Sequence, residues 1–174
     1  VIQNSTRIVL INSHGLELST DVGVVGMAAE AVVSKDGENQ ASFALESGFG
    51  EELVDSIAKR ATSDALAKIG AGEIESGKYD VIFCGKQMKD LLSTFSSVFS
   101  GRSANLGLSL LKGKEGEKIA ADCVTLIDDP QKEGSATQTA FDGEGVATCR
   151  KNVVENGVLK TLLHNLITAK KAGR

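Results

Sequence analysis

Apolar and polar residues alternate over short stretches in the first fifty positions, as is typical of β-strands. The expected strands are residues 7–11, 16–24, 27–33 and 41–47. Between the last two strands, Asp36 and Gly37 predict a tight hairpin turn, because this pair accepts the positive φ that such turns require. The beginning of the chain therefore predicts antiparallel strands.

Two later segments repeat apolar residues every three or four positions, which indicates amphipathic helices. The first is expected over residues 51–70, with Gly70 at its end, and the second over residues 87–100, with Gly101 as its stop. The apolar positions of the two helices are Leu53, Val54, Ile57, Ala58, Ala61, Ala65 and Ile69, and then Met88, Leu91, Leu92, Phe95, Val98 and Phe99.

The remaining apolar runs predict strands and a second hairpin. The expected strands are residues 79–84, 123–127, 146–154 and 158–163, the last two joined by a turn at Asn156 and Gly157. Because helices and strands come in separate runs, the sequence predicts an α+β fold with mixed or antiparallel sheets and two main helices. We expect residues 1–174 to form one region, with strands plus a helix in residues 1–72 and a helix plus a β-rich core in residues 73–174.

Composition narrows the class of protein. Of the 174 residues, 41% are hydrophobic and 24% are charged, which is the balance of a folded domain. The net charge of −4 gives no basic excess for nucleic acid, and no apolar run reaches the roughly 20 residues that span a bilayer. Three widely spaced cysteines predict buried thiols in a cytoplasmic protein rather than disulfides: Cys84, Cys123 and Cys149.

The chemical motifs are weak. Residues 72–78 approach the phosphate-binding pattern Gly-x-x-x-x-Gly-Lys, but Tyr79 stands where a hydroxyl should hold magnesium, which indicates a chance match. The only histidines, His14 and His164, are far apart and are expected in turns or on the surface. Four carboxylates could form an oxygen-rich cation site or ordinary turns, and turns are the favoured interpretation: Asp128, Asp129, Asp142 and Glu144.

Several segments, taken in order, resemble the TldD/PmbA family of metalloproteases, also described as modulators of gyrase. They are residues 75–83, 98–101, 107–109, 112–116, 124–130, 141–145, 155–160 and 166–173. The resemblance implies a piece of a longer chain from a bacterial, cytoplasmic system of two paired subunits. Such systems act on small unfolded or modified peptides and mature peptide antibiotics. In the family, the TldD-type subunit binds zinc through His-Glu-x-x-x-His, and the TldE/PmbA-type subunit lacks this motif.

The sequence departs from the zinc motif. Aligning Leu91 and Leu92 with the Leu-Leu that often precedes it places Ser93 and Thr94 at the first His-Glu and Val98 at the second His. The resemblance therefore implies a subunit of the TldE/PmbA type, with no metal, cofactor or catalytic residue of its own and with zinc in the partner. The four carboxylates would then shape turns near the substrate chamber.

Three hypotheses remain open at this point. The first is a non-catalytic subunit paired with a TldD-type partner, acting on peptides and forming a homodimer when alone. The second is a stand-alone module that binds a peptide or a protein. The third is an independent enzyme that uses the four carboxylates with a divalent ion. Neither nucleic acid nor membrane is expected as a partner.

Overall fold

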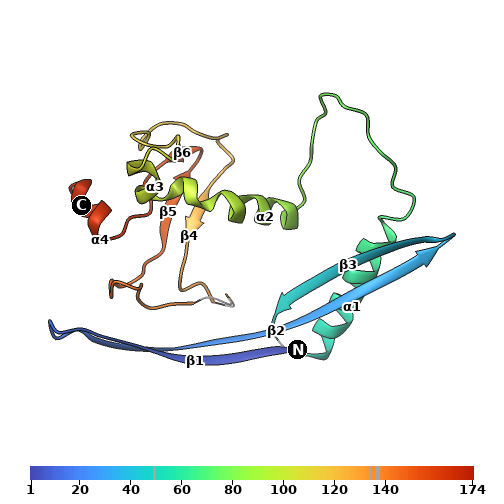
Figure 1. Cartoon of the computed structure of the whole chain (residues 1–174), viewed down its shortest axis with the longest axis horizontal. Helices are drawn as coiled ribbons and strands as arrows, with labels where there is room; N and C mark the ends of the chain where they lie inside the picture. The colour runs from blue at the N-terminus through green and yellow to red at the C-terminus, as the bar shows by residue number, and fades with distance from the viewer. Residues whose placement is uncertain (49, 134, 136–137) are drawn as a thin grey trace. The chain divides into compact units, whose positions relative to one another are not determined.

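The computed structural model describes residues 1–48, 50–133, 135 and 138–174, and these residues form two compact units (Figure 1). Unit 1 comprises residues 1–77 and 131–140, and unit 2 comprises residues 78–130 and 141–174. Both units combine an antiparallel three-stranded sheet with helices. The expected α+β class is therefore confirmed.

The sheet of unit 1 has the order β1-β2-β3 and is built around one long strand. Its strands are β1 (Ile2–Ile11), β2 (Glu17–Lys35) and β3 (Glu38–Ser47). The first half of β2 pairs with β1, the second half pairs with β3, and both ladders meet at Gly26. The expectation of separate strands at 16–24 and 27–33 was wrong, because β2 changes its partner without interrupting its own backbone.

The predicted turn between β2 and β3 is confirmed. Asp36 and Gly37 have φ values of 51° and 85°, the left-handed conformation that a two-residue hairpin requires at both positions. Lys35 pairs with Glu38 directly across this turn, so the turn sets the register of the whole β2–β3 ladder.

Helix α1 (Glu51–Leu66) packs on β2 and β3. Its buried residues Ile57 and Ala61 form a core with Ala44 of β3, and Met27 and Leu53 pack against this core. Small residues at the contact let the helix approach the sheet closely. The helix ends four residues earlier than predicted, and residues 67–70 form turns in which the Gly70 amide donates to Glu38 Oε2 at 3.0 Å.

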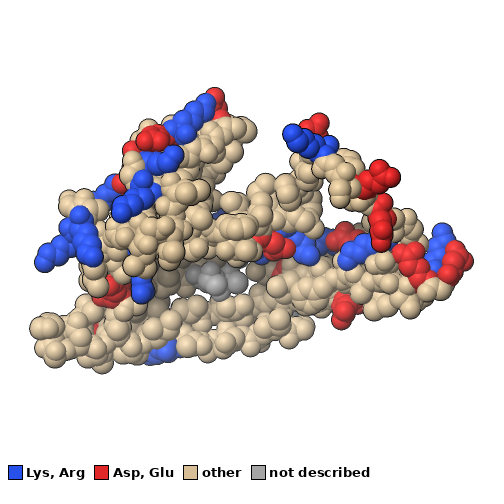
Figure 2. All heavy atoms as spheres, turned by 45° about the horizontal axis from the view of Figure 1, so that its top comes forward, with Lys and Arg blue, Asp and Glu red and all other residues tan. Residues whose placement is uncertain are grey.

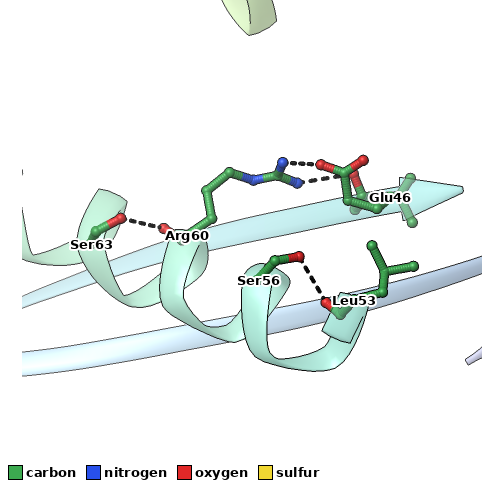
Figure 3. Close-up of polar contacts among 6 residues, drawn as sticks. Glu46, Leu53, Ser56, Arg60 and Ser63 are labelled. Carbon is green, nitrogen blue, oxygen red and sulfur yellow. Dashed lines mark hydrogen bonds and ion pairs between the residues drawn. The ribbon is translucent and has the colours of Figure 1, made fainter. Parts of the chain in front are cut away.

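Polar contacts fix α1 along β3. The guanidinium of Arg60 forms an ion pair with Glu46 and donates to the carbonyl of Leu45 (Figure 3). Figure 3 also shows the hydroxyls of Ser56 and Ser63 turned back onto carbonyls of their own helix. Both partners of the ion pair are partly exposed, so we attribute the attachment of α1 to apolar packing more than to charge.

Ile57→Ala should lower the free energy of unfolding by about 2–5 kcal/mol, because it leaves a cavity under α1 where the native side chain is only 2% exposed. Val54→Ala is the matched control on the same helix, since Val54 is 46% exposed and its truncation should cost less than about 1 kcal/mol. Urea denaturation of both variants measures this difference. Equal losses would show that the α1 face is assigned incorrectly.

The first helical region of unit 2 consists of several short segments. Helix α2 (Gly85–Phe95) passes into the 3₁₀ helix η1 (Ser96–Phe99), and α3 (Gly101–Asn105) follows at once. The expected single helix over residues 87–100 is thus two segments, and Gly101 begins a helix rather than ending one. The reason is a new N-cap: Ser100 is extended, and its Oγ accepts from the amides of Arg102 and Ser103.

The second sheet has the order β4-β5-β6 and short strands. These are β4 (Leu126–Asp128), β5 (Lys151–Glu155) and β6 (Val158–Leu159), and helix α4 (Leu166–Lys171) ends the unit. The Asn156-Gly157 turn is confirmed, with φ values of 49° and 79°. The strands expected over 123–127, 146–154 and 158–163 extend beyond the strands of the structure or are offset from them. Among their outer residues, Ala147 and Leu163 form only isolated bridges, with Phe141 and Ser100.

The strand expected over residues 79–84 is absent from both sheets of the described residues. Its apolar side chains are exposed, with Ile82 at 97% and Val81 at 66%. Apolar and β-branched composition favours a strand, but a strand forms only where a neighbouring backbone pairs with it. The prediction was wrong for that reason.

The core of unit 2 lies between α3 and the sheet. Val153, Val154 and Leu159 of the strands pack with Ala104 and Leu162, and the half-buried members of the cluster are Phe99, Leu111, Ile119 and Leu126. The loop before β4 is bound to the β5–β6 turn by backbone hydrogen bonds, including Gly116 N to Leu159 O at 2.7 Å and Ile119 N to Gly157 O at 2.8 Å.

The expectation of buried cysteines was wrong. The three cysteines are free and exposed rather than buried, because each lies in a loop or beside a helix end instead of in either core. Among the helices that the structure describes, none is both long and apolar enough to cross a bilayer.

Candidate functional site

The segment that aligns with the family's zinc motif lies at the junction of α2 and η1. Ser93 and Thr94 occupy the last turn of α2, and Val98 lies in η1. The Thr94 hydroxyl donates to the carbonyl of Asp90 at 2.8 Å, and the Ser96 hydroxyl donates to the carbonyl of Ser93 at 2.9 Å. These hydroxyls are therefore turned onto their own helix instead of toward a shared point.

The motif positions fall on two helical segments. Ser93 and Thr94 lie in α2, which ends at Phe95, and Val98 lies in the 3₁₀ helix η1.

The donor set of this segment does not fit zinc. Zinc in proteins is bound by imidazole nitrogen, thiolate sulfur or carboxylate oxygen. Residues 86–103 contain no His, Glu or Cys and a single carboxylate, Asp90, which lies outside the motif positions. The motif positions themselves offer two neutral hydroxyls and an aliphatic side chain. In the described part of the chain, no three His, Cys, Asp or Glu side chains lie close enough to hold one metal ion.

Asp128 and Asp129, two of the four predicted carboxylates, lie at the end of β4 and just after it. They face Lys151, the first residue of β5, and Arg150, which precedes β5. Asp128 Oδ2 lies 3.2 Å from Lys151 Nζ, and Asp129 Oδ2 lies 3.6 Å from Arg150 Nε. Because each carboxylate has its own cation, the pair stabilises the β4–β5 contact and presents little uncompensated negative charge.

Asp142 and Glu144, the other two carboxylates, organise a turn and a helix end. Asp142 Oδ1 accepts from the amides of Glu144 and Val146, at 2.9 and 3.0 Å, as in an Asx turn. Glu144 Oε2 accepts from the Leu166 amide at 2.8 Å in the first turn of α4, whose N-cap is Asn165. The four carboxylates are used by the fold in separate places, which gives the divalent-ion hypothesis no support.

A small apolar pocket lies beside this region, within unit 2. Its volume is about 160 Å³, close to that of cavities that hold a benzene-sized group. Its lining comes from α2, η1, β4, β5 and the segment after β6: Leu92, Ser96, Phe99, Leu126, Ile127, Asp128, Val153 and Leu163. The apolar spacing predicted Leu92 and Phe99 as helix-face residues but carried no signal that they would meet β4 and β5.

The phosphate-loop-like stretch does not lead into a helix. Residues 72–78 lie in a loop, and the next helix begins only at Gly85. A phosphate loop must open directly into a helix to use its free amides, so this stretch lacks that arrangement.

The two histidines have different environments. His14 is exposed in the β1–β2 turn, where its amide donates to Asn12 Oδ1, as expected. His164 is half-buried against Gly101, with Nδ1 3.2 Å from Thr168 Oγ1. The Thr168 hydroxyl also lies 3.1 Å from the Asn165 carbonyl, to which it donates. His164 is therefore a packing residue that joins α3 to α4, which its sequence position did not reveal.

Gly101→Ala should lower the free energy of unfolding by about 1–3 kcal/mol, because the added Cβ would lie 2.7 Å from His164 Cε1. The control is Gly143→Ala, where an added Cβ meets open space among the described atoms and stability should change by about 0.5 kcal/mol or less. Thermal and urea unfolding of the two variants test the contact. Equal stabilities would contradict it.

Glu155 has a pKa below its ordinary value, because a hydrogen bond from Lys160 and then one from Asn152 stabilise its charged form. A carboxyl whose pKa falls on folding contributes stability above its unfolded pKa and loses it as the pH falls through the folded one. Lys160→Met should therefore reduce the loss of stability between about pH 5 and about pH 3. Lys112→Met is the surface control, and an unchanged pH dependence in Lys160→Met would contradict the assignment.

Two domains of one protein family match the sequence of this chain. The PmbA/TldA metallopeptidase central domain matches residues 1–69, and the C-terminal domain of the same family matches residues 76–174. A metalloprotease of Methanocaldococcus jannaschii is 30% identical over 172 residues, which cover 94% of this chain and 37% of that protein. The metalloprotease PmbA of Escherichia coli O157:H7 is 23% identical over 168 residues, covering 93% and 37%.

Solved structures agree over the same region. A Thermotoga maritima protein described as a candidate modulator of DNA gyrase has a TM-score of 0.89 and 35% identity, covering 98% of this chain and 40% of that one. TldE from Thermococcus kodakarensis has a TM-score of 0.82 and 28% identity, covering 98% and 39%. The chain thus spans 37–40% of the length of these four proteins.

Proposed function

Because the chain belongs to the PmbA/TldD family of metallopeptidases, we propose that it is a non-catalytic subunit of the TldE/PmbA type. In this proposal it pairs with a zinc-binding TldD-type subunit in the cytoplasm. The pair hydrolyses small unfolded or modified peptides, including precursors of peptide antibiotics. The chain itself contributes the interface and part of the chamber wall.

One observation carries the proposal: the junction of α2 and η1 has no side chain suited to zinc. Ser93, Thr94 and Val98 stand where the family motif has its two histidines and its glutamate. A hydroxyl bonded to its own helix cannot serve as the general base of a metallopeptidase. The likeness to TldE supports the same assignment.

The apolar pocket supports a role in contacting peptides. At about 160 Å³ it has room for one apolar side chain, and seven of its eight lining residues are uncharged. Asp128, the charged one, is paired with Lys151, so the pocket would accept an uncharged group without leaving a bare carboxylate beside it. This chain would then position a peptide while its partner cleaves it.

Co-expression with a TldD-type subunit tests the proposal. A stable complex should form, and peptidase activity should appear only in the complex and vanish with a zinc chelator. Replacing the His-Glu of the partner's motif should abolish activity. Ser93→Ala combined with Thr94→Ala in this chain should leave the rate within about twofold, since neither hydroxyl takes part in the reaction.

Two results would contradict the proposal. Chelator-sensitive cleavage by this chain alone would make it catalytic. Failure to form a complex, together with peptide binding by the isolated chain, would favour the stand-alone binding module instead.

A further inference from the structure

We draw no further inference here: the strongest candidate, the apolar stripe that Met88, Leu91, Leu92 and Phe95 expose along α2 beside the small pocket of unit 2 (tan in Figure 2, with the other uncharged residues), carries nothing, because no described part of the structure shows what covers it.

Discussion

A zinc ion in a protein needs imidazole, thiolate or carboxylate donors that converge on one point, and the interpretation of this chain depends on that requirement. Where the family motif would supply these donors, α2 and η1 supply the hydroxyls of Ser93 and Thr94 and the isopropyl group of Val98. The chemistry of these side chains leads to the proposal of a subunit that depends on a partner.

The four predicted carboxylates of unit 2 have structural contacts. Asp128 and Asp129 form ion pairs with Lys151 of β5 and with Arg150 just before it. Asp142 and Glu144 accept from backbone amides of a turn and of helix α4. The small pocket beside η1 in unit 2 is lined mainly by apolar side chains. Such a pocket suits contact with an apolar group of a polypeptide better than contact with an ion.

Local rules predicted the parts of the fold that depend on neighbouring residues. The Asp36-Gly37 and Asn156-Gly157 turns and the helix beginning at Glu51 follow from backbone preference and apolar spacing alone. Residues 79–84 and the three cysteines were assigned wrongly, since pairing and burial depend on distant parts of the chain. For the same reason, the pocket beside Leu92 and the packing of His164 on Gly101 could not be read from sequence spacing.

Metal content measures the central claim most directly. The protein should be purified alone and in complex with a TldD-type subunit, and zinc should be quantified by mass spectrometry after exhaustive dialysis. We expect negligible zinc in the isolated chain and one zinc per complex, all of it lost when the partner's histidines are replaced. Stoichiometric zinc that stays with the isolated chain would contradict the account.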